Sequence, residues 1–330
     1  MILKHLYNMH NKLLLLVIIL FFAACSKKKI QVEYNEIVVS TKDRLNKIKF
    51  FDANIGFIVG GDQYTKATVL KTINGGATWE AINLPTNNEQ KEIYSFDILP
   101  NGQIVTVGYG GTIYLSDDTG KTFRYVQHHS WKELKDVACI NSAQALIVGG
   151  TGFNSGHHSQ FDMDGLGNNV ITQDYNFEIS DVDFVNDKLA YMCGYGALLK
   201  STDGGVNWNH TSAKNDFFKA MCWKNAQEGI TVGYEGSIHK TTDGSDSWVV
   251  VRNGNDITKR KVHFFDVARN STNRIVAVGE RGVVFISLDD GDSWAESNKF
   301  TYDDLRGVTF KDEATIFCVG DKGRVFEVKF

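Results

Sequence analysis

Short apolar strands alternate with glycine-rich turns along almost the whole chain of 330 residues. Seven runs of mainly β-branched or aliphatic residues end in such a turn, which we call a tip. The tips are Val59-Gly60-Gly61, Val107-Gly108-Tyr109-Gly110, Val148-Gly149-Gly150, Cys193-Gly194-Tyr195-Gly196, Val232-Gly233-Tyr234-Glu235-Gly236, Val278-Gly279-Glu280-Arg281-Gly282 and Val319-Gly320-Asp321-Lys322-Gly323. They lie roughly 40 to 48 residues apart, a spacing typical of propeller blades.

Each repeat shows the pattern of four short strands. The first strand is apolar, the second ends in the tip, the third leads into another kind of turn, and the fourth leaves that turn through an aromatic residue. First strands occur at Ile48–Phe51, Leu134–Val137, Val182–Phe184, Phe218–Met221, Val262–Phe265 and Val308–Phe310. Strands this short, rich in β-branched and aromatic residues and bounded by Gly, Asn, Asp and Ser, predict an all-β repeat protein.

The other kind of turn, which we call the acidic turn although one copy has Asn in place of Asp, occurs five times. Its residues are close to the order hydroxyl, any residue, Asp or Asn, any residue, Gly, any residue, hydroxyl, aromatic. The Asp or Asn oxygen accepts hydrogen bonds from nearby backbone N–H groups, Gly tolerates positive φ, and the aromatic residue packs inward. We therefore expect structural roles for Asn74 and Trp79, Asp118 and Phe123, Asp203 and Trp208, Asp243 and Trp248, and Asp289 and Trp294.

These repeats predict a seven-bladed β-propeller of four-stranded antiparallel blades. It occupies residues 30–330 as a single domain, because each blade can bury its faces only against its neighbours. The seventh repeat ends after three strands, at Arg324–Phe330. The segment Ile30–Val38 is the available candidate for the fourth, and we predict that it closes the ring and removes an open sheet edge.

The third repeat is irregular. Its acidic turn is expected to have decayed to Thr172–Phe177, and its tip to carry an insertion from Thr151 to Asn169. Within the insertion His157, His158, Asp162 and Asp164 are weak candidates for a metal site, since imidazole and carboxylate groups are common ligands. The alternative is a solvated, glycine-rich loop.

Adjacent strands of a blade run in opposite directions, so the tips share one face of the ring with the connections between blades. The five acidic turns must then lie on the opposite face. The tip face therefore carries the candidate binding residues, since tyrosine and arginine are enriched where proteins recognise partners. They are Asp62, Tyr109, Tyr195, Tyr234, Glu235, Glu280, Arg281, Asp321 and Lys322. The alternative is that these turns are simply polar and exposed.

The N-terminus resembles a bacterial lipoprotein signal. Lys4 and Lys12 precede the apolar run Leu13–Phe22, which is too short to span a bilayer, and Ala23-Ala24-Cys25 follows. The resemblance implies that residues 1–25 carry the signal, with cleavage before Cys25 and a diacylglyceryl group on its thiol. Ser26 fits sorting to the outer membrane, facing the periplasm or the cell surface. A simple signal peptide with an incidental cysteine is the alternative.

Charge and cysteine content narrow the partners. The net charge is −4, and loss of Lys4 and Lys12 with the signal would make it about −6, which disfavours nucleic acid. The remaining cysteines fall in first or second strands, and we expect them to serve as small apolar residues with free, buried thiols. The alternative is that they pair in disulfides. They are Cys139, Cys193, Cys222 and Cys318. Their spacing matches no metal motif, and no cofactor is expected.

The five acidic turns resemble the Asp box of sialidase-like propellers. Sialidases of that class use three arginines to hold a sugar carboxylate, with a Tyr/Glu pair and an acidic residue. The arginines here are scattered over strands and hairpins, and a Gly-x-Ser-x-Gly or His-Glu-x-x-His motif is absent from the sequence. We expect a non-enzyme, with glycan binding or glycoside hydrolysis at a cavity lined by Tyr109, Tyr195 and Tyr234 as the alternative.

The stretches Cys193–Trp208 and Val232–Trp248 resemble the photosystem II stability/assembly factor family. That resemblance implies a seven-bladed, exported propeller, in some members a lipoprotein, that acts without catalysis in the assembly of a membrane protein. Photosynthetic members use an arginine-rich patch, whereas only Arg281, Lys322 and Arg324 lie near matching tips here. We therefore expect a lipid-anchored scaffold that binds an envelope or membrane protein.

Overall fold

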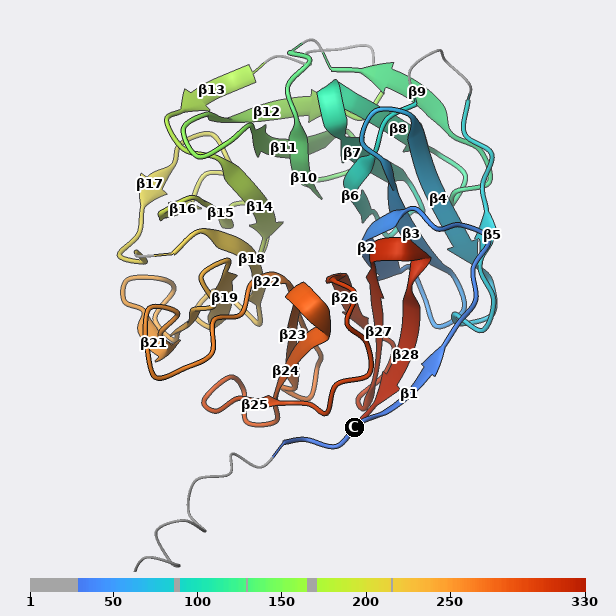
Figure 1. Cartoon of the computed structure of the whole chain (residues 1–330). Helices are drawn as coiled ribbons and strands as arrows, with labels where there is room; N and C mark the ends of the chain where they lie inside the picture. Colours follow the sequence, from blue (N-terminus) through green and yellow to red (C-terminus); the bar gives the residue numbers. More distant parts are fainter. Residues whose placement is uncertain (1–28, 86–89, 129, 165–170, 215) are drawn as a thin grey trace, which may run out of the picture.

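The computed structural model describes residues 29–85, 90–128, 130–164, 171–214 and 216–330. They form seven four-stranded antiparallel sheets arranged as blades around a central axis (Figure 1), which confirms the predicted fold. Residues 1–28, with the expected signal and Cys25, lie outside the described residues.

The blades follow one another in chain order. Blade one contains β2 (Arg44–Phe50), β3 (Gly56–Asp62), β4 (Lys66–Thr72) and β5 (Glu80–Ala81); blade two contains β6 (Ile93–Ile98), β7 (Ile104–Gly108), β8 (Thr112–Ser116) and β9 (Arg124–Gln127). Blade three contains β10 (Leu134–Cys139), β11 (Gln144–Gly150), β12 (Gly156–Asp162) and β13 (Ile171–Tyr175); blade four contains β14 (Ile179–Phe184), β15 (Ala190–Gly194), β16 (Ala197–Ser201) and β17 (Asn209–His210). Blade five contains β18 (Phe218–Trp223), β19 (Gly229–Gly233), β20 (Ile238–Thr241) and β21 (Val249–Arg252); blade six contains β22 (Phe264–Arg269), β23 (Ile275–Gly279), β24 (Val283–Ser287) and β25 (Ala295–Glu296). Blade seven contains β26 (Leu305–Phe310), β27 (Thr315–Gly320), β28 (Val325–Lys329) and β1 (Glu33–Glu36).

The N-terminal strand closes the ring as predicted. β1 pairs antiparallel with β28, so that Glu33 faces Lys329 and Glu36 faces Phe326. The strand is shorter than the predicted segment, because Ile30 instead forms a bridge with Ser297 of blade six. The outer edge of β28 is therefore covered, and the described part of the chain begins against the neighbouring blade.

The core lies between neighbouring blades, where the faces of adjacent sheets meet. One apolar cluster, for example, joins Val278 of β23, Val308 of β26 and Phe326 of β28. All seven innermost strands also carry a one-residue bulge near their start, as between Leu134 and Asp136 in β10. Such a bulge re-aims the following side chains, here at the axis of the ring.

The Asp boxes are held by a repeated set of hydrogen bonds. In blade four, Ser201 Oγ accepts from Gly205 N at 2.9 Å and donates to Asp203 Oδ1 at 2.8 Å, and Asp203 Oδ1 accepts from Asn207 N at 2.9 Å. Gly204 N donates to the carbonyl of Lys188, 2.8 Å away in the first hairpin of the same blade. These bonds lower the pKa of Asp203 to about 2 and fix the turn.

Blade three differs from the prediction. The expected tip insertion Thr151–Asn169 is wrong, since Gly156–Asp162 form strand β12 and only the residues before Gly156 remain in the tip. The expected decayed Asp box is also wrong, because Thr172 and Asp174 lie in the outer strand β13. The connection from β12 to β13 thus takes the place that the Asp boxes occupy in blades one, two, four, five and six.

The four cysteines of the described chain are free, as expected, and lie in β10, β15, β18 and β27. Cys193, Cys222 and Cys318 are also buried as expected, whereas Cys139 is only half-buried. The described residues include no helix that is both apolar and long enough to span a membrane.

Candidate functional site: the tip face and the central channel

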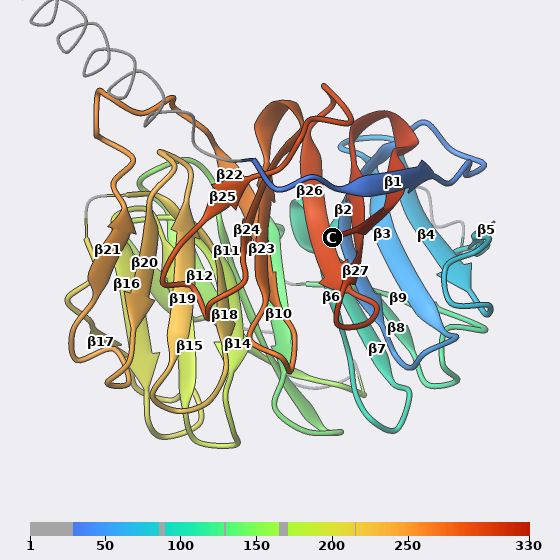
Figure 2. The ribbon, with the colours of Figure 1, turned by 90° about the horizontal axis from the view of Figure 1, so that it is seen from below.

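The tips and the connections between blades share one face of the ring. Tyr109 N donates to Glu92 O at 2.9 Å, and Glu280 N to His263 O at 2.9 Å, so each of these tips is bonded to the connection that enters its own blade. Three tips form short 3-10 helices: η1 (Tyr109–Gly111), η2 (Glu280–Gly282) and η3 (Asp321–Gly323). This tip face points to the viewer in Figure 1 and upward in Figure 2.

An aromatic groove of about 640 Å³ lies on the tip face, beside blades three to five. Its rings are Phe153, Tyr195, Phe217 and Tyr234, with centroids 4.9 Å apart for Phe153 and Tyr195 and 5.6 Å apart for Tyr195 and Phe217. Three of them are exposed, by 62% for Phe153, 46% for Tyr195 and 38% for Tyr234. Exposed aromatic side chains gathered around a hollow are typical of a binding surface.

The groove brings together only part of the predicted set. Tyr195, Tyr234 and Glu235 line it, whereas Tyr109 packs against Tyr64 with ring centroids 5.2 Å apart, outside the groove. The sequence reasoning missed Phe153 and Phe217. Their signal was an aromatic residue inside an otherwise polar or glycine-rich turn.

The other predicted tip residues mostly pair locally. Asp62 Oδ1 accepts from Thr65 Oγ1 at 2.7 Å within its own turn. Glu280 lies 3.0 Å from His263 Nδ1, Asp321 lies 2.5 Å from Arg306 Nε, and Lys322 lies 2.6 Å from Asp303.

Arg281 is the predicted cation that stands out from this face. Its side chain is well exposed, and its Nε lies 3.9 Å from Glu280. Arg324, in contrast, is held between Asp303 and Glu36. The cations around blade seven are thus largely offset by neighbouring carboxylates.

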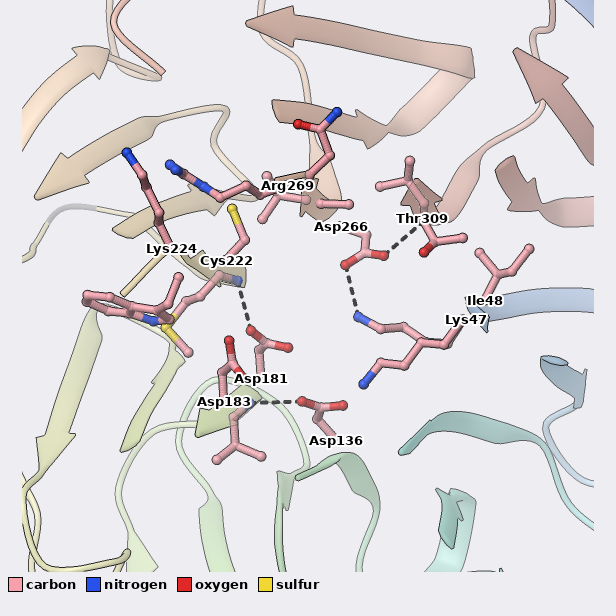
Figure 3. Close-up of a pocket in the computed structure, with 18 of the residues that line it drawn as sticks. Lys47, Ile48, Asp136, Asp181, Asp183, Cys222, Lys224, Asp266, Arg269 and Thr309 are labelled. Atoms are coloured by element: carbon pink, nitrogen blue, oxygen red, sulfur yellow. Dashed lines mark hydrogen bonds and ion pairs between the residues drawn. The ribbon is translucent and has the colours of Figure 1, made fainter. Parts of the chain in front are cut away.

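Charged side chains from the inner strands fill the central channel. The third residue of three of these strands is an aspartate that accepts a hydrogen bond from the backbone of the next blade (Figure 3). Asp136 bonds to Val182 N at 2.9 Å, Asp181 to Met221 N at 2.8 Å, and Asp266 to Val308 N at 3.0 Å. These carboxylates tie adjacent blades together.

The channel charges act strongly on one another. Lys47 Nζ lies 3.0 Å from Asp266 Oδ1 (Figure 3). Burial opposes the charge of Lys47, but Asp266, Asp181 and Asp136 together raise its pKa above the ordinary value. Burial, and then the neighbouring Asp136, raise the pKa of Asp181 well above its usual range. Burial likewise raises the pKa of Asp183 to about 7.

The channel is wider toward the Asp-box face than toward the tip face. The hollow in Figure 3, which reaches Lys224 and Arg269, measures about 480 Å³. The hollow on the tip side, lined among others by Tyr94, Lys135 and Arg306, measures about 160 Å³. That volume is below the range of small-molecule pockets, so the tip end of the axis offers little room for a sugar.

The four metal candidates are not assembled into one site. His157 and His158 are buried in β12, and His158 Nδ1 lies 2.9 Å from Tyr175 Oη. Burial lowers the pKa of both imidazoles to about 4. Asp162 ends the same strand, about 14 Å from His158, and Asp164 follows it. Across the described ranges no group of three or more His, Cys, Asp or Glu side chains is placed to hold a metal ion.

Comparison with known proteins supports the expected resemblance. No family model matches the chain. It is 23% identical over 152 residues to the photosystem II assembly lipoprotein Ycf48 of Synechococcus sp. (strain CC9902). The match covers 44% of this chain and 43% of that relative, so it spans less than half the length of the curated relative.

Solved structures share the fold along nearly the whole chain. YCF48 bound to D1 peptide superposes with a TM-score of 0.71 at 17% identity, covering 92% of this chain and 98% of that one. YCF48 from Cyanidioschyzon merolae gives 0.69 at 17% identity, with 89% and 98% covered. Virginiamycin B lyase from Staphylococcus aureus gives 0.71 at 11% identity, with 91% and 100% covered. An assembly factor and a lyase thus give the same TM-score, so the structural likeness shows only the propeller fold. The sequence match adds a distant relationship to Ycf48.

Proposed function

We propose that this protein is a lipid-anchored, non-catalytic propeller that binds an envelope or membrane protein through its tip face and supports the assembly of that partner. The observation that carries the proposal is the aromatic groove. Aromatic side chains that become buried in a complex supply much of the energy of protein recognition. In this protein the aromatic side chains of the groove are accessible to a partner and lie on a folded propeller.

The residues that line the groove favour an extended segment of a partner. Phe153, Tyr195 and Tyr234 offer apolar area, while Lys214 and Glu235 offer charges at its border. A solved structure has YCF48 bound to a D1 peptide, and the distant sequence match of this chain to a Ycf48 protein supports peptide binding as the mode of recognition here.

The proposed anchor is a lipid on Cys25. The relative from Synechococcus is described as a lipoprotein, which supports export and attachment to a membrane for this chain. Ser26 after the modified cysteine favours the outer membrane, and the proposed position there faces the periplasm or the cell surface.

The proposal that the protein is not an enzyme is supported by the hydrogen bonds of the aspartates in the channel. Asp136, Asp181 and Asp266 all line the channel, and each already accepts a backbone hydrogen bond between blades. Their positions serve blade-to-blade contact, which favours a structural role over acid–base chemistry.

Co-purification from cross-linked cell envelopes tests this function. The test variant combines Phe153→Ala, Tyr195→Ala and Tyr234→Ala, and the matched control combines Ile73→Ala, Val206→Ala and Leu288→Ala, three exposed apolar residues of the Asp-box turns. We expect one envelope protein to be enriched about 100-fold less with the test variant and equally with the control, because each lost anchor weakens binding.

Two results would contradict the proposal. One is an envelope partner whose enrichment is the same for the native protein and the folded test variant. The other is an absence of any enriched protein together with binding of the native protein to a glycan array, which would favour the carbohydrate alternative.

A further inference from the structure

The connection between β21 and β22 carries an exposed apolar residue followed by three cations. Ile257 is 99% exposed, and Lys259, Arg260 and Lys261 follow it. Figure 2 shows this connection projecting beyond its neighbours on the tip face. Asn255, in the same connection, lines the aromatic groove, so the projection borders the proposed binding site.

The base of this connection is firmly held. Arg252 is buried, and its Nη2 donates to the carbonyl of Arg260 at 2.7 Å. Its guanidinium also lies over the rings of Phe264 and Phe285, at 5.9 and 5.6 Å from their centroids. The connection is therefore anchored to blade five at Arg260, and the fully exposed Ile257 precedes this anchored point by three residues.

A basic hollow of about 570 Å³ lies between this connection and blade six. Four cations line it, namely Lys29, Arg252, Lys259 and Arg260, against the single carboxylate of Glu296. Arg260 Nη2 lies 2.6 Å from Glu296, and Lys259 Nζ lies 3.5 Å from Asp256 in the same connection. Two carboxylates thus offset part of the charge of the four cations, and an excess of positive charge remains.

Lys299 and Arg281 extend this positive surface along the tip face. Lys299 Nζ donates to the carbonyl of Arg281 at 2.6 Å, which is a neutral acceptor. Burial, with Arg260, Lys29 and Arg281 as cationic neighbours and Glu296 opposing them, lowers the pKa of Lys299. A group of like charges held this close gains from an anionic counterpart.

The start of the described chain ties this surface to the proposed anchor. Ile30 N donates to Glu296 O at 3.1 Å, so Lys29 is fixed at the edge of the hollow. Cys25 precedes Lys29 by four residues, which bounds its distance at about 14 Å in any conformation. A lipid on Cys25 therefore places the basic surface next to the bilayer.

We propose that Lys29, Lys259, Arg260, Arg281 and Lys299, which we call the basic rim, dock on anionic phospholipid headgroups with Ile257 inserted at the interface. The proposal rests on the lipid anchor of the proposed function and adds the orientation of the propeller: the tip face, with its groove, is turned toward the membrane. Clustered cations next to an anchor bind anionic lipid surfaces, and an exposed apolar side chain adds contact with the interface.

The test uses the full lipidated protein reconstituted into vesicles that contain no other protein. An environment-sensitive fluorophore is attached at Ile257→Cys or, as a control, at Leu288→Cys on the Asp-box face. Labelling of the unsubstituted protein gives the background from the native thiols. We expect a blue shift at position 257 in vesicles of phosphatidylcholine with phosphatidylglycerol, none in phosphatidylcholine alone, and none at position 288. High salt should abolish the shift through screening.

Charge reversal separates lipid binding from simple proximity. Lys259→Glu with Lys299→Glu should remove the shift at position 257, whereas Lys121→Glu with Lys188→Glu, exposed lysines near the Asp-box turns, should leave it unchanged. Equal shifts in neutral vesicles, equal shifts at position 288, or no shift with the lipidated protein would each overturn the proposal. A shift that arises only after envelope proteins are added would also overturn it, in favour of a protein-docking surface.

The two proposals fail in different ways. Mass spectrometry of Cys25 decides whether the premise of a lipid anchor holds, and a protein without the lipid would overturn the proposed orientation. The vesicle test contains no partner, so its failure leaves the co-purification result unaffected.

Discussion

The two faces of the ring are built from the same repeat, but they differ in which features recur from blade to blade. On the Asp-box face the same hydroxyl and carboxylate bonds recur, as at Ser116 and Asp118 in blade two and at Ser287 and Asp289 in blade six. On the tip face only the backbone at the base of the tip recurs.

Glycine is required at the base of a tip for a steric reason. A Cβ on Gly194 would lie 1.8 Å from Glu178 O, and one on Gly320 would lie 1.9 Å from Asp304 O. The residues that follow differ from blade to blade, for example Tyr195 in blade four and Asp321 in blade seven. A repeat can thus conserve a scaffold on both faces and still leave one face free to acquire recognition residues.

The base and the apex of one tip offer the largest contrast in stability. Gly194→Ala should lower the free energy of unfolding by about 3 kcal/mol, because the new Cβ meets backbone that cannot move aside. Gly196→Ala, in the same tip, has no atom within 4 Å of its new Cβ and should cost about 1 kcal/mol, from its positive φ alone. Urea unfolding of both variants measures the difference, and equal losses would contradict the distinction.

Removal of one Asp-box hydroxyl should have the next largest effect. Ser201→Ala leaves Gly205 N without its buried acceptor and should cost about 2 kcal/mol of unfolding free energy, while binding of the envelope partner stays unchanged. Val206→Ala, an exposed change in the same turn, is the control and should stay within about 0.5 kcal/mol. Loss of partner binding in folded Ser201→Ala protein would show that this face also recognises the partner.

Asp183 in the channel and Asp203 in an Asp box should make contributions to stability that change with pH in opposite directions. Asp203, with its pKa lowered to about 2, stabilises the fold above pH 4 and loses that effect as pH falls toward 2. Asp183, with its pKa raised to about 7, is favoured in its protonated form, so its contribution declines as pH rises from about 4 to about 7.

Asp183→Asn tests this sign. The variant should be about 2 kcal/mol more stable than the native protein at pH 8 and nearly equal to it at pH 4, since the amide resembles the protonated acid. Urea unfolding at both pH values gives the comparison. A variant less stable at pH 8 than at pH 4, relative to the native protein, would contradict the raised pKa.

The smallest expected effect concerns the Asp box of blade five, which has Ser245 at the position where the other four Asp boxes have glycine. Ser245 adopts φ of 73° where Gly205 in blade four adopts 85°. Ser245→Gly should therefore stabilise the protein by about 0.5–1 kcal/mol, and Gly205→Ser should destabilise it by a similar amount. A lower Tm for Ser245→Gly would show that the serine side chain contributes more than its backbone strain costs.

The sequence was sufficient to predict the architecture because the tips recur at a nearly constant spacing. The last repeat also lacks a fourth strand, and the N-terminal segment was the available candidate to supply it. It failed in blade three because β12 contains His157, His158 and Ser159, polar residues whose burial no hydrophobic pattern reveals. His158 is accommodated by Tyr175, a contact between strands that periodicity cannot indicate.

The site was predicted only in part for a related reason. Tyr195 and Tyr234 were found because they stand in the repeated tip, whereas Phe153 and Phe217 lie in a misassigned segment and a connection. Tyr109 occupies an equivalent tip but faces Tyr64 instead. Which tips meet depends on the geometry between blades, and the same holds for the aspartates that the bulges direct into the channel.

Photo-crosslinking in living cells tests the central claim most directly, because it reports which face touches a partner. A benzophenone amino acid is placed at Tyr195 on the tip of blade four or at Val206 in the Asp box of the same blade. We predict an adduct with one envelope protein from position 195 and none from position 206. The same adduct from both positions, or from position 206 alone, would contradict the assignment of recognition to the tip face.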